Sequence, residues 1–139
     1  MSLPPAPKSF YEQYRWDPEE AKRQAYEFGR IMGQNLMRAI GVVDADLGGL
    51  VLVLNEFQRR VHGEPNARVE GETIKMHCRG FCPVMRAAMT HDIPWRWLDE
   101  YYALPMFNGL ASLFVPNTRV RLLTAKNRGD PECLYLFEA

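Results

Sequence analysis

Apolar residues in the first half of the chain recur every three or four positions, which is the period of an amphipathic helix. Asp17 precedes a proline and two acidic residues, and this combination favours a helix start because carboxylates there meet unpaired backbone N–H groups. We predict a helix from this point to about Ile40, ending at Gly41. A second helix is predicted over 46–61, with apolar residues at helical spacing: Leu47, Leu50, Val51, Leu54 and Phe57.

The middle of the chain changes to a period of two and then back to helical patterns. Residues 68–78 alternate in part, which predicts a half-buried strand. A short helix is predicted to begin at Cys82 or Pro83, because proline is common at the first helical position. A longer and strongly aromatic helix is predicted over 95–114, with a kink at Pro105.

Two further strands are predicted at the C-terminal end, over 119–126 and 132–137, joined by a turn over 127–131. The order of helices, a strand, more helices and a hairpin is typical of an α+β fold with an antiparallel sheet. A chain of 139 residues is long enough for one hydrophobic core. We therefore predict a single domain over 11–139, preceded by a flexible, proline-rich arm over 1–10.

The charge balance argues against one class of partner. The 17 basic and 17 acidic residues give a formal net charge of zero and are interspersed, so no basic stripe marks a nucleic-acid-binding surface. The longest apolar run, 47–54, is too short to cross a bilayer. We predict a cytoplasmic protein without nucleic-acid or membrane partners, whose three cysteines are free thiols in a reducing compartment.

The three cysteines connect the middle of the sequence to its C-terminal edge. Cys78 is predicted to close a strand, Cys82 to open a helix, and Cys133 to lie in the last strand. Backbone N–H groups at a helix start favour the thiolate, so we predict Cys82 to be the most reactive thiol. As a nucleophile it would need His77 or His91 as its base. A metal site, a redox pair of the first two cysteines, and a purely structural role as small buried residues are the alternatives.

The aromatic helix predicted over 95–114 contains the candidate ligand site. Its rings, with two tyrosine hydroxyls among them and a glycine that leaves space beside a phenylalanine, match the mostly apolar character of small-molecule sites. A packed core and a dimer face are the alternatives, because aromatic residues at helical spacing occur in both. We assign ligand-binding roles to Trp95, Tyr101, Tyr102, Phe107, Gly109 and Cys133.

Gly29 and Gly33 lie four positions apart on one face of the first long helix. Two glycines lower its helix propensity, so the close approach of another backbone is expected to compensate. The apolar neighbours Phe28, Met32 and Leu36 would let two copies of this helix pack together. We predict a homodimer formed through this face.

Three segments of the chain together carry a family resemblance. They are the glycine-spaced helix 26–33, the Cys82-Pro83 helix start, and the ending 129–137, which reads Gly-Asp-Pro-Glu-Cys-Leu-Tyr-Leu-Phe. They resemble the 4-vinyl-reductase-type ligand-binding domains and the related L-2-amino-thiazoline-4-carboxylic acid hydrolase-like proteins. The resemblance implies the fold of transport-particle subunits, in which helices cover one face of an antiparallel sheet around an apolar pocket, and a dimer built from the N-terminal helices. These families often have a further cysteine after the Cys-Pro motif, where this chain has Tyr101 and Tyr102.

Three hypotheses follow for the function. The first is a small-molecule-binding domain of the vinyl-reductase-like type, with an apolar, aromatic or heterocyclic ligand between the sheet and the aromatic helix. The second is a cysteine-dependent hydrolase of a small heterocycle or amide that uses Cys82, with a backbone N–H near the helix start stabilising the oxyanion. The third is a structural or assembly subunit whose pocket is filled by side chains. The sequence specifies no cofactor.

Overall fold

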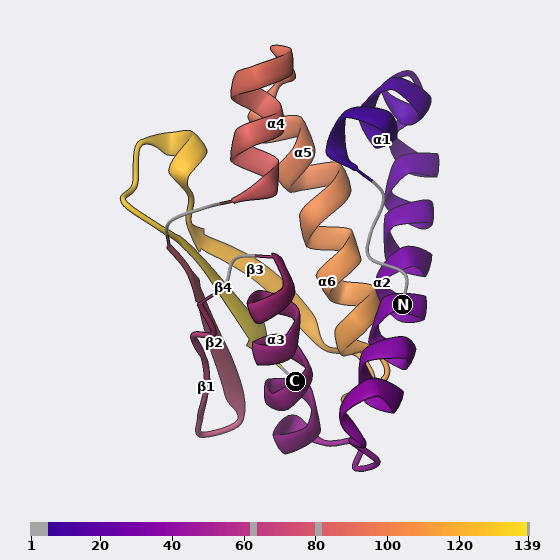
Figure 1. The fold of residues 1–139 in the computed structure, drawn as a ribbon, viewed down its shortest axis with the longest axis vertical. Coiled ribbons are helices and arrows are strands. Elements are labelled where there is room, and N and C mark those ends of the chain that lie inside the picture. Colours follow the sequence, from indigo (N-terminus) through magenta and orange to yellow (C-terminus); the bar gives the residue numbers. More distant parts are fainter. Residues whose placement is uncertain (1–5, 62–63, 80–81, 139) are drawn as a thin grey trace.

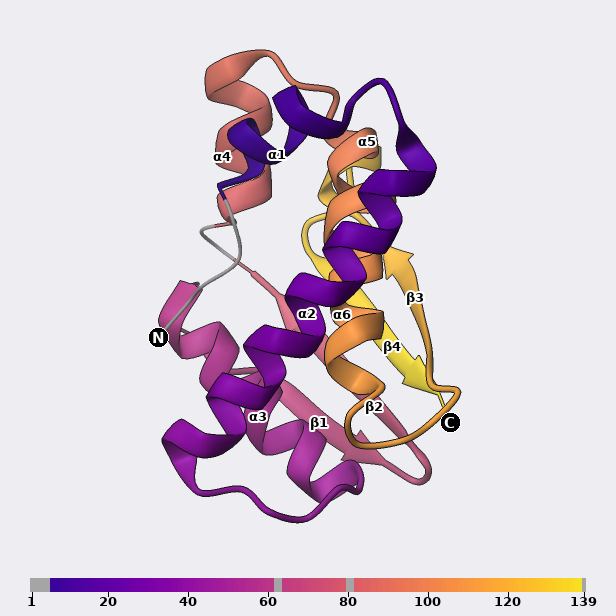
Figure 2. The ribbon, with the colours of Figure 1, turned by 90° about the vertical axis from the view of Figure 1, so that its right-hand side faces the viewer.

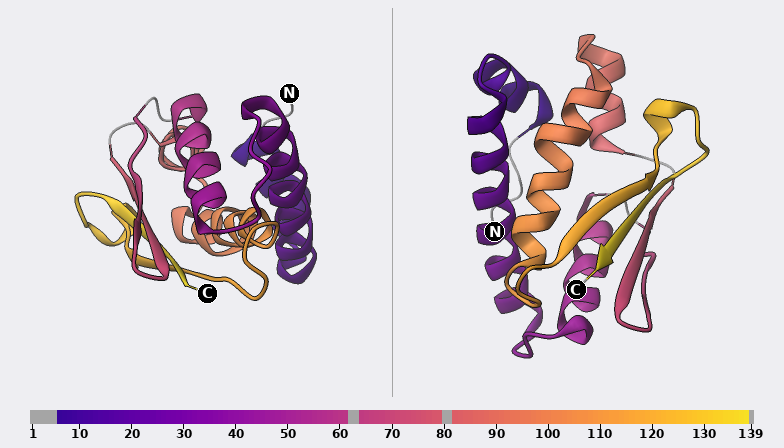
Figure 3. Two further views of the ribbon diagram at one scale, coloured as in Figure 1. Left: turned by 90° about the horizontal axis from the view of Figure 1, so that it is seen from below. Right: turned by 180° about the vertical axis from the view of Figure 1, so that it is seen from behind.

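The fold combines one antiparallel sheet with a layer of helices. The computed structural model describes residues 6–61, 64–79 and 82–138. The strands lie in the order β1-β2-β4-β3, and the helices cover one face of the sheet (Figures 1 and 3). The predicted α+β fold is therefore confirmed. The strands are β1 (Ala67–Glu70), β2 (Thr73–Cys78), β3 (Arg119–Thr124) and β4 (Cys133–Glu138).

Helical elements fill most of the remaining chain. Of the helices in the described part of the chain, none combines the length and apolar character needed to cross a bilayer. The second and third α-helices match the predicted ranges closely. The elements are α1 (Pro7–Tyr14), α2 (Pro18–Ile40), α3 (Leu47–Val61), α4 (Pro83–His91), α5 (Trp95–Leu98), the π-helical segment η1 (Asp99–Ala103), α6 (Leu104–Ala111) and the short 3₁₀ helix η2 (Lys126–Arg128).

The ends of α2 form as the sequence predicts. The Asp17 side chain accepts a hydrogen bond of 3.2 Å from the backbone N–H of Glu20, which satisfies one of the unpaired donors at the helix start. At the other end Gly41 has φ 72°, a left-handed conformation that favours glycine and stops the helix.

The glycines of α2 allow its backbone to approach α6 closely, and Figure 2 shows these two helices side by side. A Cβ on Gly29 would collide with the carbonyl oxygen of Met106, and a Cβ on Gly109 would collide with the carbonyl oxygen of Tyr26. A Cβ on Gly33 would lie 2.7 Å from the Leu113 side chain. The expected close approach is confirmed, but the predicted dimer contact through Gly29 and Gly33 is wrong, because this face is occupied by α6 of the same chain.

Two predicted segments, the strand over 68–78 and the arm over 1–10, differ from the structure. The single strand predicted over 68–78 is a hairpin, because Gly71 adopts φ 63° and reverses the chain between β1 and β2. The predicted arm over 1–10 contains the start of α1, where Phe10 is only 1% exposed and packs against Phe28 and Tyr102. Burial of this ring anchors the segment from residue 6 onward, whereas residues 1–5 lie outside the described residues.

The aromatic helix is irregular before Pro105 rather than at it. Proline has no N–H, and its ring crowds the carbonyl group four residues earlier, here that of Tyr101. The backbone widens into the π-helical turn η1, in which the N–H of Leu104 bonds to the carbonyl of Asp99. The helix then ends at Ala111, earlier than the predicted Phe114.

Two amide side chains on α3 join this helix to the edge of the sheet. Asn55 bonds to both the N–H and the C=O of Ala67 at 2.9 and 3.2 Å, as a neighbouring strand would. Gln58 is fully buried, donates to the carbonyl of His77 and accepts from the N–H of Asn66, both at 2.8 Å. These bonds satisfy backbone groups of Ala67 in β1, of Asn66 just before it and of His77 in β2, and they hold α3 over the sheet.

Replacement of Gly29 by alanine tests the close packing of α2 and α6. We expect Gly29→Ala to lower the free energy of unfolding by about 3 kcal/mol, because the new Cβ meets rigid backbone rather than a movable side chain. Urea unfolding measures this loss. The matched variant Gly48→Ala adds a Cβ on an exposed part of α3 and should be neutral or stabilising by up to about 1 kcal/mol. Equal effects of the two substitutions would contradict the packing argument.

Candidate functional site

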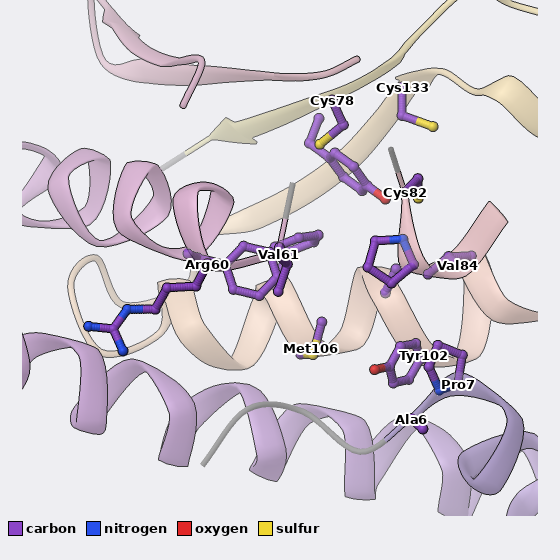
Figure 4. Close-up of a pocket in the computed structure, with 15 residues that line it drawn as sticks. Ala6, Pro7, Arg60, Val61, Cys78, Cys82, Val84, Tyr102, Met106 and Cys133 are labelled. Carbon is purple, nitrogen blue, oxygen red and sulfur yellow. The ribbon is translucent and has the colours of Figure 1, made fainter. Parts of the chain in front are cut away.

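A cavity of about 330 Å³ lies between the sheet and the helices. It is bounded by the start of α1, the end of α3, the two central strands, the start of α4 and the helix formed by η1 and α6 (Figure 4). Most of its wall is apolar, contributed by Phe57, Val61, Val84, Ala103, Met106 and Phe107.

All three cysteines line this cavity (Figure 4). Cys78 ends β2 and Cys133 begins β4, and the two are direct partners in the antiparallel register. Cys82 is the N-cap residue of α4. The predicted position of each cysteine in its element is confirmed, and all three are free thiols. Cys78 and Cys133 are buried, whereas Cys82 is partly exposed.

Burial raises the pKa of each thiol. For Cys82 the loss of hydration outweighs the backbone N–H groups of Met85 and Val84, which approach the sulfur without completing a hydrogen bond and act in the opposite direction. The predicted stabilised thiolate at this helix start is therefore wrong. Burial raises the pKa of Cys133 to about 11, although the hydrogen bond from the Lys126 N–H acts in the opposite direction. Burial raises the pKa of Cys78 further. The thiols are protonated at neutral pH.

Two tyrosine hydroxyls add polar groups to the apolar wall. Tyr102 and Tyr135 both line the cavity and are 4% and 5% exposed. Burial raises the pKa of both phenols, so they stay neutral and keep a proton to donate. Figure 4 shows the Tyr102 hydroxyl directed along the cavity toward Met106. These groups can orient a ligand that carries a single polar substituent.

Asp99, which was not among the predicted site residues, is a buried carboxyl group that lines a surface groove separate from the cavity. It is 5% exposed and accepts a hydrogen bond from the Asn127 side chain. Burial raises its pKa to about 6, and Asn127 and Arg128 oppose this effect. Its charge in turn contributes to the raised pKa of Cys82 and Cys133. Helical spacing does not single out Asp99, because it lies in the π-helical turn, where regular α-helical spacing is lost.

The two candidate bases do not face Cys82. His77 lies on the strand face opposite to Cys78, where its Nδ1 is 2.8 Å from Glu132, which also pairs with Arg79. His91 is exposed at the last position of α4. It lies nine positions along the helix from Cys82, which corresponds to about 13 Å. The described structure therefore brings neither imidazole to the thiol.

The predicted aromatic site is divided in two. Tyr102 and Phe107 line the cavity, with the Phe107 ring centroid 4.9 Å from that of Tyr135. Trp95 lines a separate surface groove with Asp99, and its buried Nε1 has no partner among the described residues. Tyr101 packs outside the cavity against Trp97 and under the Lys22 ammonium group. The predicted space beside Gly109 does not exist, because α2 fills it.

The comparisons with known proteins name no relative. No protein-family model matches the chain, and no curated protein matches it. Within the described ranges 6–61, 64–79 and 82–138, no group of three or more histidine, cysteine or acidic side chains is placed to hold a metal ion. The family resemblance of the sequence therefore remains a prediction, and the cavity is the feature on which a function can be argued.

The raised pKa of Asp99 predicts a pH-dependent stability. The folded protein keeps this proton to about pH 6 whereas the unfolded chain releases it near pH 4, so the contribution of Asp99 to stability is full below pH 4 and is lost as the pH rises toward 6. Relative to wild type, we expect Asp99→Asn to gain up to about 3 kcal/mol in unfolding free energy between pH 4 and pH 7.

Urea unfolding at several pH values measures this difference. Asp44→Asn, which replaces an exposed carboxylate far from the cavity, is the control and should run parallel to wild type. Parallel curves for Asp99→Asn would show that the carboxyl group is hydrated in solution.

Proposed function

We propose that the protein is a small-molecule-binding domain of the vinyl-reductase-like type, which holds a neutral apolar or aromatic ligand between the sheet and the η1–α6 helix. The observation that carries this proposal is the cavity itself, about 330 Å³ with a mostly apolar wall. An apolar cavity of about 150 Å³ in another protein holds benzene. The cavity described here is therefore large enough for a molecule of two fused rings.

The polar groups of the wall support a neutral ligand. The hydroxyls of Tyr102 and Tyr135 and the three thiols are uncharged at neutral pH, because burial raises the pKa of each group. Arg60 is the one charged residue among the described lining residues. Its guanidinium group turns away from the thiols in Figure 4 and pairs with Glu56 at 2.8 Å. A charged ligand would find no opposite charge directed at it from these residues.

The same features favour binding over the two other hypotheses. A cysteine hydrolase needs a base within reach of its nucleophile, and His77 and His91 lie elsewhere. A protonated Cys82 thiol is also a weak nucleophile. An assembly subunit would have a pocket filled by side chains, whereas this one is open.

Ligand binding is tested by thermal unfolding in the presence of phenol, 2-naphthol and 1-hydroxypyrene, which increase in size. We expect 2-naphthol to raise the unfolding temperature most, because two rings match the cavity volume. At a hundredfold excess over Kd the stabilisation is about 2.7 kcal/mol, which corresponds to several degrees.

Ala103→Phe places a ring in the cavity and should abolish this shift while the variant still unfolds cooperatively. Ala39→Phe adds the same ring on the exposed surface of α2 and should keep the shift. If Ala103→Phe does not fold, Met106→Trp fills the same space. No shift with any of the three phenols, or an unchanged shift in a folded cavity-filling variant, would refute the proposal.

We also propose that the protein is a cytoplasmic homodimer, with a dimer surface different from the glycine face. Three free thiols suit a reducing compartment. Large apolar side chains remain exposed on or beside α2, at Trp16, Tyr26, Ile31 and Ile40. At 100° per residue, Ile31 points away from the glycine face of α2, whereas Tyr26 and Ile40 lie on or beside that face. We place the contact between two copies at Ile31, which is 44% exposed on the outward side of α2.

Sedimentation of the variant Ile31→Glu tests this dimer. A charge on the outward side of α2 should convert the dimer to a monomer, because an unpaired carboxylate is costly in an interface. Leu52→Glu places the same charge at an exposed site on α3 and should leave the dimer unchanged. A monomeric wild-type protein would contradict the proposal directly.

A further inference from the structure

Cys78 and Cys133 face each other across two adjacent strands of the cavity wall. They are direct partners in the β2–β4 register. The N–H of His77 bonds to Asn66 at 2.9 Å on the β1 side, so the backbone of Cys78 is directed toward β4. The two cysteines are thus a hydrogen-bonded antiparallel pair, for which the Cα–Cα distance is about 5.5 Å. Disulfides form at Cα–Cα distances of about 4.4–6.8 Å.

Each sulfur is held by a different donor in the reduced protein. The Cys78 Sγ lies 3.9 Å from Nε2 of Gln58, and the Cys133 Sγ accepts from the N–H of Lys126 at 3.4 Å. The Cβ atoms of a hydrogen-bonded pair lie about 5.5 Å apart, whereas those of a disulfide lie about 3.5–4.5 Å apart. Closing the S–S bond therefore draws the two strand ends together as well as rotating both side chains. The cavity gives a small oxidant access to both thiols, since both line it.

We propose that Cys78 and Cys133 are a redox dithiol, which a hydroperoxide small enough to enter the cavity oxidises to a disulfide. One sulfur attacks the terminal peroxide oxygen, the O–O bond breaks, and the products are a sulfenic acid and an alcohol, or water where the oxidant is hydrogen peroxide. The second sulfur then attacks the sulfenic sulfur, forms the S–S bond and releases water. The two thiols lose two electrons and two protons, and the peroxide gains them.

The disulfide also changes the binding site, and this part of the proposal rests on the proposed function. The S–S bond removes two thiols from the cavity wall and fixes the sulfurs against the sheet. We expect the thermal shift given by 2-naphthol to fall in the oxidised protein. Disulfide formation itself needs no ligand, so the mapping described next is independent of whether 2-naphthol binds.

Peptide mapping of the wild-type protein tests the dithiol directly. After reduction, removal of the reductant and treatment with hydrogen peroxide, the remaining thiols are blocked with N-ethylmaleimide in denaturant. Trypsin places the three cysteines on separate peptides, 76–79, 80–86 and 129–139. We expect peptides 76–79 and 129–139 to be linked, and peptide 80–86 to carry N-ethylmaleimide. The rate should rise about tenfold per pH unit below the Cys133 pKa of about 11, because the thiolate is the attacking species.

Three variants separate this pair from other combinations. Cys82→Ala should still lose two hydrogens and take no N-ethylmaleimide, whereas Cys78→Ala and Cys133→Ala should not form the linked species. Linkage of Cys82 to either partner as the main wild-type product, or full N-ethylmaleimide labelling of peptides 76–79 and 129–139, would overturn the proposal. The wild-type map decides the question even where a variant does not fold.

Discussion

The backbone contact between α2 and α6 determines where the cavity lies. Because Gly29 and Gly109 have no Cβ, each helix packs against a carbonyl group of the other, and α6 is held between α2 and the sheet. From this position Phe107 contacts Tyr135 and Phe57, with ring centroids 4.9 and 5.4 Å apart. These aromatic contacts fix the spacing of the layers at α6. The cavity lies toward the N-terminal end of this helix, between the last turn of α3 and the start of α4.

The π-helical turn gives two residues of one helix different environments. An extra residue per turn at η1 changes the direction of the side chains that follow it, and such turns occur frequently at functional sites. Here Asp99 is directed toward η2, where Asn127 bonds to it, while Tyr102 lines the cavity. Pro105 supplies the physical cause, since its ring excludes a regular α-helical bond to Tyr101. The sequence therefore indicates, through Pro105, that the helix is irregular. It does not indicate that the irregularity takes the form of a π-helical turn.

The features of the fold that could be predicted from the sequence are those set by neighbouring residues, such as helix ends and strand alternation. Asp17 and Gly41 end α2 as expected, and the alternation in β2 places Cys78 and His77 on opposite faces. The hairpin turn at Gly71 was missed, although the apolar positions change from odd numbers before it, Ala67 and Val69, to even numbers after it, Ile74 and Met76.

Contacts between distant segments were the part that the sequence did not reveal. Gly29 indicates that another backbone approaches α2 closely, but the sequence does not show which one. In the structure this neighbour is α6 and not a second copy of the chain. In the same way, nothing near His77 in sequence indicates its pairing with Glu132. Of the predicted site residues, the structure places Cys82, Tyr102, Phe107 and Cys133 around one cavity.

The apolar wall that makes the cavity suitable for a ligand also makes its thiols poor nucleophiles. A rise of one pKa unit corresponds to about 1.4 kcal/mol, so the rise at Cys133 from 9.0 to about 11 means that charging this thiol costs about 3 kcal/mol more than in water. At Cys82 the helix start offers N–H groups that stabilise a thiolate, but the same burial outweighs them. Strong nucleophilic catalysis would require more polar groups around the sulfur, and these would in turn weaken the binding of an apolar molecule. The low polarity of this wall therefore suits the proposed binding of an apolar molecule, and it would make the proposed thiol oxidation slow.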